Sequence, residues 1–444
     1  MADGARSDHP AVQQQLDRLS LLARGGDTLG LERIEAVLEH FGNPQDKLPP
    51  IFHVAGTNGK GSTCAFLRAA IEAEGLTCHV YTSPHLVRFN ERIRIAGSLI
   101  EDEYLADILA RVLDKSENIC PTFFETTTVA AILAFTENPA DACILETGVG
   151  GRLDATNIIS NPSAAAICSL GIDHKEFLLD PIEPDAPTDP LCRIAWKKAG
   201  IAKKYTPLLT QKYEANVAKT IEDHANSVGA QYLPRGKDWD AVTYENQLHY
   251  RDEKGKIALP LPRMEGPHQA DNAALAIAML RHQNDINISD SSLAGAMAWA
   301  EWPARLQKLA VGPLTDLAPG GSTIWLDGGH NADAGKAIAA KFDGDEKPIH
   351  LIIGMLANKE PSAIIEPLAH KLASIAVVPI EGHNCHSIES FRPISQNLEI
   401  KIVAMNNVER SLDALPKDKP LNILVSGSLY LAGDVLAANN QRPD

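Results

Sequence analysis

Short apolar runs alternate along the chain with longer segments in which apolar residues recur at helical spacing. The run Ile51–Ala55 predicts a buried strand, Gly56–Ser62 predicts a glycine-rich turn, and Thr63–Glu74 has the periodicity of a helix. Further buried strands are expected at Ala142–Glu146, Ala164–Ser169, Thr323–Leu326, His350–Ile353, Ser374–Pro379 and Asn422–Val425, and helices at Gln269–His282 and Asp333–Lys341. This alternation predicts an α/β fold with mostly parallel sheets flanked by helices.

The chain has 444 residues, which is enough for two domains. Helical segments continue to about Ala300, and a new series of strands follows the glycine-rich stretch Leu317–Gly321. We therefore place the joint near Trp302–Arg305 and predict an N-terminal domain of residues 1–303 and a smaller C-terminal α/β domain of residues 304–444.

Composition narrows the choice of partner and compartment. The formal net charge of -16 argues against nucleic acid or an anionic membrane as the main partner. The seven cysteines lie singly, several of them inside apolar runs, which is typical of a reducing compartment. The N-terminus has no apolar signal region, and no stretch approaches 18 apolar residues. A cytoplasmic protein that acts as a monomer is expected.

The glycine-rich turn Gly56–Ser62 stands between a predicted strand and a predicted helix, where phosphate is most easily bound. Glycines let backbone N–H groups face phosphate oxygens, the helix N-terminus adds a positive dipole, and Lys60 adds a full charge. The turn departs from the general Walker pattern, because Val54 replaces the first glycine and Gly61 separates Lys60 from the hydroxyl of Ser62. A plain glycine turn is the alternative.

A carboxylate ends the strand predicted at Ala142–Glu146. Glu146 would lie at the carboxyl end of a strand beside the glycine turn, where a nucleotide-bound Mg²⁺ needs an oxygen ligand. Taken alone, such a glutamate is more often a solvated strand end.

Two other segments attract attention. Asp180–Pro190 carries prolines at every third position, which predicts an extended surface loop, with a motif for a proline-binding partner as the less favoured alternative. His383–His386 offers two histidines and one thiol, which make only an incomplete zinc site.

Three stretches together go beyond a generic nucleotide-binding protein: His53–Ser62, Tyr81–Leu86 and Glu146–Asn157. In this order and spacing they resemble the dihydrofolate synthase / folylpolyglutamate synthase family of the Mur ligase superfamily. The match continues through Gly171–His174, Lys198–Ile201, Asn272–Ala274, Arg305 and Asp327–Asn331.

The resemblance implies a P-loop ATPase-type, mostly parallel-sheet N-terminal domain and a Rossmann-like C-terminal domain. It also implies an ATP-dependent amide ligase that uses two Mg²⁺ ions. Its substrates would be L-glutamate with either dihydropteroate or reduced folates, and the reaction would pass through an acyl phosphate. The open alternatives are a folylpolyglutamate synthase alone, a peptidoglycan-type Mur ligase, for which the fifty residues before the loop are few, or a protein that binds without turnover.

The resemblance also implies roles for particular residues. Catalytic roles fall to Lys60, His174 and Lys198, of which Lys198 is expected to be carbamylated. ATP would contact Gly59, Lys60, Gly61, Ser62, Asn272, Arg305 and Asp327. The metal ligands would be Ser83, Glu146 and His174. The pterin site would be lined by Thr28, Leu29, Gly30, Thr122, Phe123, Phe124, Glu125, Leu153, Asp154 and Ala155.

Three features depart from the family pattern. The proline-rich segment lengthens the path from His174 to Lys198, Lys197 stands where a glutamate is common, and Gly329 replaces the usual alanine before His330.

Overall fold

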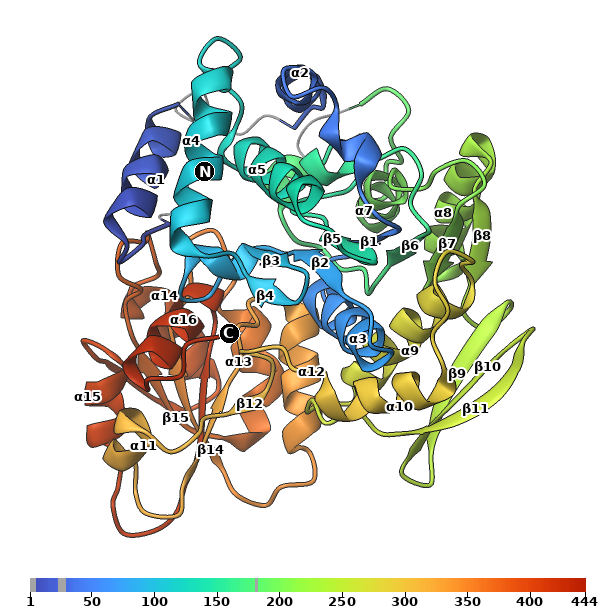
Figure 1. Ribbon diagram of the computed structural model, residues 1–444. Coiled ribbons are helices and arrows are strands. Elements are labelled where there is room, and N and C mark those ends of the chain that lie inside the picture. Colours follow the sequence, from blue (N-terminus) through green and yellow to red (C-terminus); the bar gives the residue numbers. More distant parts are fainter. Residues whose placement is uncertain (1–4, 23–28, 180–182) are drawn as a thin grey trace. The chain divides into compact units, whose positions relative to one another are not determined.

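The computed structural model describes residues 5–22, 29–179 and 183–444 (Figure 1). These residues form two compact units. One consists of Met1–Pro84, Phe89–Arg263 and Gln269–Glu301, and the other of His85–Arg88, Met264–His268 and Trp302–Asp444. The main passage from one unit to the other falls between Glu301 and Trp302. The assignment of separate binding roles to residues 1–303 and 304–444 stays a prediction.

The first unit is built on an eight-stranded sheet of order β4-β3-β2-β5-β1-β6-β7-β8. Its strands are β1 (Ile51–Ala55), β2 (Cys78–Tyr81), β3 (Ile93–Ile95), β4 (Ser98–Leu99), β5 (Ala142–Glu146), β6 (Ala164–Ile167), β7 (Pro207–Thr210) and β8 (Gln231–Pro234). The six strands from β2 to β8 in this order are parallel to one another, and β3 pairs antiparallel with both β2 and β4. The predicted mostly parallel sheet is confirmed.

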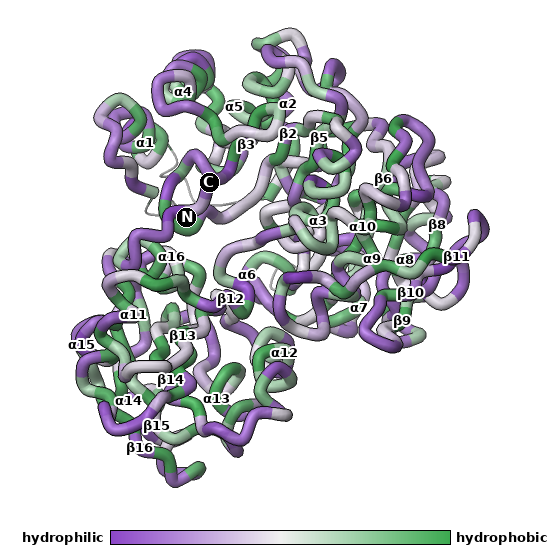
Figure 2. The backbone as a smooth tube through the Cα atoms, turned by 60° about the horizontal axis from the view of Figure 1, so that its bottom comes forward, coloured by the Kyte–Doolittle hydropathy of each residue, from purple (hydrophilic) through white to green (hydrophobic). Residues whose placement is uncertain are grey.

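Helices cover both faces of this sheet (Figure 1). The helices and short 3-10 turns are α1 (Pro10–Leu22), α2 (Glu32–Glu39), η2 (Pro44–Lys47), α3 (Lys60–Ala73), η3 (Phe89–Arg92), α4 (Asp102–Ser116), α5 (Phe123–Glu137), η4 (Ala155–Ile158), α6 (Lys175–Leu178), α7 (Pro190–Ala199), α8 (Ala215–Val228), α9 (His268–Arg281) and α10 (Asp290–Trp299). Apolar side chains of α1, α2, α4 and α5 form one core with β1, β2 and β5. Hydrophilic and hydrophobic residues alternate along α1 and α4, as their one-sided burial requires (Figure 2).

A small antiparallel sheet of order β11-β10-β9 follows β8. Its strands are β9 (Trp239–Tyr244), β10 (Gln247–Asp252) and β11 (Gly255–Pro260). The alternation of buried and exposed residues in β10 is that of a sheet with one packed face. The sequence analysis did not predict this sheet.

The second unit contains a six-stranded sheet of order β12-β13-β17-β14-β15-β16, parallel except for β12. Its strands are β12 (Gln307–Lys308), β13 (Thr323–Leu326), β14 (Ile349–Ile353), β15 (Leu372–Val377), β16 (Lys401–Ala404) and β17 (Asn422–Ser426). Its helices are α11 (Pro313–Leu317), α12 (Ala332–Phe342), α13 (Ser362–Leu368), η5 (Ala369–Lys371), α14 (Ile388–Asn397), α15 (Val408–Asp413) and α16 (Leu429–Ala438). Two apolar clusters in this unit give it a core of its own. In the described ranges, every helix is too short or too polar to cross a bilayer.

Strand order determines where a ligand can bind in the first unit. The chain leaves β1 toward β2 and β5 on one side, and later returns to β6 on the other side of β1. Ligands of open α/β sheets bind outside the carboxyl ends of the strands, where the order reverses in this way. The glycine turn and Glu146 both lie at that edge.

Candidate active site

The glycine turn joins β1 directly to α3, and packing explains its glycines. Gly59 precedes α3 with a φ of 88°, and a Cβ there would overlap the side-chain amide oxygen of Asn272. Gly56 has a φ of 156°, and a Cβ there would lie 2.7 Å from the Cβ of Cys168. The turn can therefore approach its neighbours only because both residues lack a side chain.

Lys60 is the first residue of α3, and its side chain curls back over the turn. Its Nζ donates to the carbonyl oxygen of Gly56 at 3.2 Å and lies 4.0 Å from Oε1 of Glu146. The Lys60 side chain is 15% exposed and that of Glu146 is 5% exposed. An ammonium group and a carboxylate thus flank the N-terminus of a 14-residue helix, where phosphate is favoured by dipole and charge together.

Glu146 is oriented by a backbone donor. The N–H of Ser83 donates to Oε2 of Glu146 at 3.3 Å, and Glu146 pairs with Val54 in the register of β1 and β5. Carboxylate and hydroxyl oxygens are the hard donors that Mg²⁺ prefers, and it is usually held by one or two carboxylates together with phosphate oxygens. Ser83 and Glu146 therefore fit the magnesium ligands predicted from the sequence.

The segment that carries His174 is attached to the glycine turn. The hydroxyl of Thr57 donates to the carbonyl of Gly171 at 2.9 Å and accepts from its N–H at 3.1 Å. Just before α6, His174 has a φ of 48°, and its N–H donates to the carboxylate of Asp173. The sequence analysis assigned no role to Thr57, although it quoted the motif that contains this residue.

Lys198 lies in the last turn of α7 and is 4% exposed. Its Nζ donates to the carbonyl oxygen of Gly56 at 2.8 Å, the same oxygen that Lys60 contacts. Burial, and after it the charge of Lys60, lowers the pKa of Lys198 from an ordinary 10.5 to about 7. Two amines therefore meet at one carbonyl oxygen, and burial favours the neutral form of Lys198.

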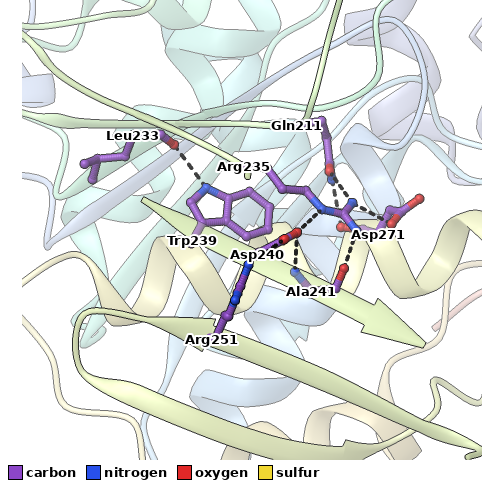
Figure 3. A network of polar contacts seen from close by, with 8 residues as sticks. All are labelled: Gln211, Leu233, Arg235, Trp239, Asp240, Ala241, Arg251 and Asp271. Carbon is purple, nitrogen blue, oxygen red and sulfur yellow. Dashed lines mark hydrogen bonds and ion pairs between the residues drawn. The ribbon is translucent and has the colours of Figure 1, made fainter. Parts of the chain in front are cut away.

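Asn272 follows the first turn of α9, which a polar network holds at Asp271 (Figure 3). The guanidinium of Arg235 donates to Asp271 at 2.6 Å and to the side chain of Gln211 at 3.0 Å. Gln211 in turn donates to the carbonyl of Asp271 at 2.8 Å. Arg235 also lies over the ring of Trp239, so that the small sheet and β8 both contribute to holding Asn272 beside Gly59.

The predicted pterin-lining residues at the start of α5 divide into two kinds. Thr122 and Glu125 form a capping box, and Phe123 is 4% exposed in the core. Phe124 is half-buried and stacks on Tyr81, with ring centroids 5.8 Å apart. Of these four residues, Phe124 has the geometry of a stacking face for a flat ring.

Glu125 is held by an arginine that the sequence analysis missed. Arg33 of α2 donates from Nη2 to Oε1 of Glu125 at 2.7 Å and from Nε to Oε2 at 2.9 Å. The pair joins α5 to the helix that begins just after Leu29 and Gly30. Thr28 lies outside the described residues. No spacing rule could have found a pair 92 residues apart in the chain.

Asp154 is buried and bound to backbone and hydroxyl donors. Its Oδ2 accepts from the N–H of Val149 at 2.8 Å, and its Oδ1 accepts from the hydroxyl of Thr156 at 2.6 Å. Burial raises the pKa of Asp154 in spite of these donors. The Asp154 carboxylate therefore connects the two ends of the loop that follows Glu146, through its hydrogen bonds to Val149 and Thr156.

Arg305 and Asp327 lie in the second unit, at a strained turn. Ala304 and Leu306 have φ values of 55° and 45°, a region that costs non-glycine residues free energy. Asp327 is 5% exposed and accepts from the N–H of Leu306 at 2.8 Å. The Asp327 carboxylate therefore stabilises the strained backbone turn, Ala304–Leu306, that carries Arg305.

His383 and His386 have other partners than a metal. Nδ1 of His386 contacts the hydroxyl of Ser390 at 3.0 Å, Nε2 contacts the carbonyl of Lys359 at 2.7 Å, and His383 stacks on Tyr430. Both ring nitrogens of His386 are thus in use.

Replacing Arg33 by methionine is expected to lower the free energy of unfolding by about 2 kcal/mol, because the buried Glu125 carboxylate loses its cation. The loss is smaller than for a fully buried ion pair, since the Arg33 side chain is partly exposed to solvent. Urea unfolding of the variant measures the effect. Arg18→Met is the matched control, because its partner Asp114 is exposed. Equal losses of unfolding free energy in Arg33→Met and Arg18→Met would contradict the view that Arg33 neutralises a buried carboxylate.

Comparisons with known proteins identify the family of this chain. A family described as "Dihydrofolate synthetase, C-terminal domain" matches residues 313–438. The folylpolyglutamate synthase of Lacticaseibacillus casei is 31% identical over 431 residues, covering 93% of this chain and 94% of that protein.

Solved structures are similar over nearly the whole chain. Escherichia coli FolC in complex with DHPP and ADP has a TM-score of 0.84 at 29% identity, covering 98% of this chain and 99% of that one. The bifunctional folylpolyglutamate synthase/dihydrofolate synthase from Yersinia pestis, complexed with AMPPNP and Mn ion, has a TM-score of 0.82 at 28% identity, covering 99% and 98%. The sequence identity, the share of each chain covered and the similarity of fold agree, and the chain belongs to the dihydrofolate synthase / folylpolyglutamate synthase family.

Proposed function

We propose that this protein is an ATP-dependent ligase that adds L-glutamate to dihydropteroate, giving dihydrofolate, and to reduced folates, giving folylpolyglutamates. The observation that carries the proposal is the meeting of Lys60 and Lys198 at the carbonyl of Gly56, with Glu146 beside Lys60. Family membership supplies the chemistry that this arrangement would serve. Residues 1–303 would bind ATP and the pterin substrate, and residues 304–444 would contribute Arg305 and Asp327 to the nucleotide.

The reaction requires a carboxylate to become an electrophile. A substrate carboxylate oxygen attacks the γ-phosphorus of ATP, ADP leaves, and an acyl phosphate forms. The amino group of glutamate then attacks the acyl carbon, loses a proton, and phosphate leaves. A carboxylate resists amines until its oxygen carries such a leaving group, so alignment and charge neutralisation are the protein's main tasks.

The residues around the glycine turn are suited to these tasks. The backbone of Gly59, Gly61 and Ser62 at the start of α3 would hold the phosphates, and Lys60 would neutralise the transferring group. Glu146, Ser83 and His174 are the proposed Mg²⁺ ligands, and Mg²⁺ when bound supplies charge that stabilises the leaving phosphate. Asn272 would face the adenine.

The pterin would lie against Phe124, near Leu29, Gly30 and the Leu153–Ala155 loop. Thr122, Phe123, Glu125 and Asp154 would shape this surface through the capping box, the core and the loop hydrogen bonds described above. Thr28 is retained in the proposal on the resemblance alone.

The compartment and assembly are part of the proposal. All seven cysteines are free thiols, which fits the reducing cytoplasm. We infer a monomer without nucleic-acid or membrane partners, consistent with the net charge of -16.

The enzyme is expected to use dihydropteroate as well as a reduced folate. The sequence retains the three segments proposed to line the pterin site, Thr28–Gly30, Thr122–Glu125 and Leu153–Ala155, which favours both activities. ADP release is measured with each acid plus glutamate and with each component alone, and mass spectrometry identifies the products. Extension of a reduced folate without any dihydrofolate from dihydropteroate would leave a folylpolyglutamate synthase alone. ADP release that needs no glutamate would argue against ligation altogether.

A further inference from the structure

Three charged side chains meet where the proline-rich segment reaches the end of α7. Nζ of Lys197 lies 2.5 Å from Oε1 of Glu183, and the guanidinium of Arg152 pairs with Oε2 of the same carboxylate. The Lys197 side chain is 6% exposed and that of Glu183 is 22% exposed. Arg152 also lies over the ring of Trp196, 4.6 Å from its centroid. Glu183 is thus the shared counter-ion of two cations.

A buried ammonium at position 197 has a direct bearing on Lys198. Successive residues of a helix point about 100° apart, so the two lysines cannot face the same group. Lys197 turns to Glu183, while Lys198 reaches the carbonyl of Gly56 at 2.8 Å. A buried charge without a partner is strongly destabilising, so Lys197 needs an anion if α7 is to keep this orientation.

The same carboxylate attaches the loop that follows Glu146 to α7. The N–H of Arg152 donates to the carbonyl of Lys197 at 2.7 Å. A Cβ on Gly151 would lie 2.9 Å from the carbonyl oxygen of Lys198, and one on Gly200 would overlap the side chain of Arg152. Arg152 immediately precedes Leu153–Ala155, so the loop proposed to face the pterin and the helix that carries Lys198 share one ion-pair cluster.

The proline-rich segment is fastened to α7 along its described length. Arg193 donates to the carbonyl of Leu179 and to that of Pro187, each at 2.8 Å. Asp189 caps the helix by accepting from the N–H of Cys192, and Pro190 opens it. These contacts lie at Leu179 and at Pro187–Asp189, before and after Glu183 in the chain. The prediction of an extended loop was therefore wrong for the described part of the segment, because the N–H of Ala186 donates to the carbonyl of Glu183 at 3.1 Å in a turn and Pro190 already belongs to α7.

We propose that Glu183 is a positioning residue, which neutralises Lys197 and Arg152 so that α7 presents Lys198 to the glycine turn and the Leu153–Ala155 loop keeps its place. The inference rests on the proposed function, because it assigns Glu183 to the same active site. It gives the proline-rich segment a role within the enzyme.

A rescue experiment tests the role of the charge. Glu183→Gln keeps the shape but removes the anion, and kcat/KM for the pterin acid is expected to fall about tenfold or more, as for residues that orient catalytic groups. Lys197→Met removes the cation instead, and its activity should stay close to that of the wild type. The double variant Glu183→Gln/Lys197→Met should recover to within about threefold of the wild type, because an apolar side chain in place of a buried ion is often tolerated and Arg152, whose side chain is 31% exposed, can be hydrated without Glu183.

The matched control is Glu137→Gln, which breaks the ion pair with Arg111 in the same unit at a partly exposed position. It should leave kcat/KM unchanged. A second measurement follows ¹³C-labelled bicarbonate by NMR, and the carbamate signal expected on Lys198 should weaken in Glu183→Gln and return in the double variant. A merely structural contact would shift thermal stability in the single variant without this recovery.

The outcomes separate the inference from the proposed function. If the wild type ligates glutamate but Glu183→Gln does so equally well, the positioning role is wrong and the function stands. The role is equally refuted if the double variant is no better than Glu183→Gln. Should Glu183→Gln fail to fold, a folded and active double variant supports the role, and an unfolded or inactive one contradicts it. A wild type without ligation would instead overturn the function.

Discussion

Lys60→Ala is expected to lose ligase activity by about a thousandfold or more, because it removes the charge that neutralises the transferring phosphoryl group. The fold should survive, because the contacts that are lost are long: Nζ of Lys60 lies 3.2 Å and 3.5 Å from the carbonyl oxygens of Gly56 and Thr57, and 4.0 Å from the carboxylate of Glu146. Steady-state ADP release with dihydropteroate and glutamate measures the loss. A circular dichroism spectrum and an unfolding midpoint close to those of the wild type would establish that the variant is folded.

The control for this variant is Lys219→Ala, which removes an exposed lysine of α8 in the same unit. Its activity should match that of the wild type. If folded Lys60→Ala ligates at the wild-type rate, the phosphate-binding role of the glycine turn is wrong. If it loses nucleotide binding as well as turnover, Lys60 contributes to the ground state and to the transition state alike.

The pattern of apolar residues predicts an element correctly where neighbouring residues alone determine its structure. The strand Ile51–Ala55 has the predicted bounds, because an apolar run before a glycine turn has few alternatives in an α/β chain. The helix after it begins at Lys60 and not at the predicted Thr63. The first turn of this helix contains Lys60, Gly61 and Ser62, which are not apolar, so hydrophobic periodicity does not reveal it.

One missed feature was legible in the sequence. Thr122 and Glu125 have the Thr-x-x-Glu spacing of a capping box ahead of an apolar run, which is a helix-start signature. The family resemblance implies only a pterin-lining role for these two residues. The structure places both in the cap of α5 and leaves Phe124 as the half-buried aromatic of this stretch.

Other features could not be predicted from one sequence. Arg33 meets Glu125 across 92 positions, and Glu183 meets Arg152 across 31. Each pair depends on how helices and loops are stacked, which hydrophobic periodicity does not encode. The same holds for Lys198: its lysine pair is visible in the sequence, but its burial and its contact with Gly56 follow from the packing of α7 against the turn after β1.

Lys198→Ala is expected to lose most of its ligase activity, and acetate or another short carboxylic acid is expected to restore part of it. The reason is that Lys198 should act as a carbamate. Its neutral amine attacks the carbon of CO₂, a proton leaves, and the product is an anion with two oxygens. The Mg²⁺ ion proposed to bind His174 would need anionic oxygen, and an ammonium group would repel it. A free carboxylic acid can supply similar oxygens in the space left by the truncated side chain.

The position of Lys198 favours the neutral amine that carbamylation requires. Burial and the nearby charge of Lys60 lower its pKa to about 7, so the amine is about half neutral at that pH. Carbamate formation should therefore rise as the pH rises through 7. Stability should change in the same direction: between about 7 and 10.5 the unfolded chain binds more protons at this lysine than the folded chain does, so without carbamate the free energy of unfolding increases with pH.

Three measurements test the carbamate. Wild-type activity after removal of CO₂ should fall and recover on addition of bicarbonate, and ¹³C NMR with labelled bicarbonate should show a signal that Lys198→Ala lacks. Lys197→Met is the control, because its amine is paired with Glu183 and faces away from Gly56; the signal should persist in that variant. Full activity of Lys198→Ala without any added acid would refute the proposal. Loss of activity with neither acetate rescue nor a bicarbonate-dependent signal in the wild type would leave Lys198 as a buried amine that supports the glycine turn through Gly56 alone.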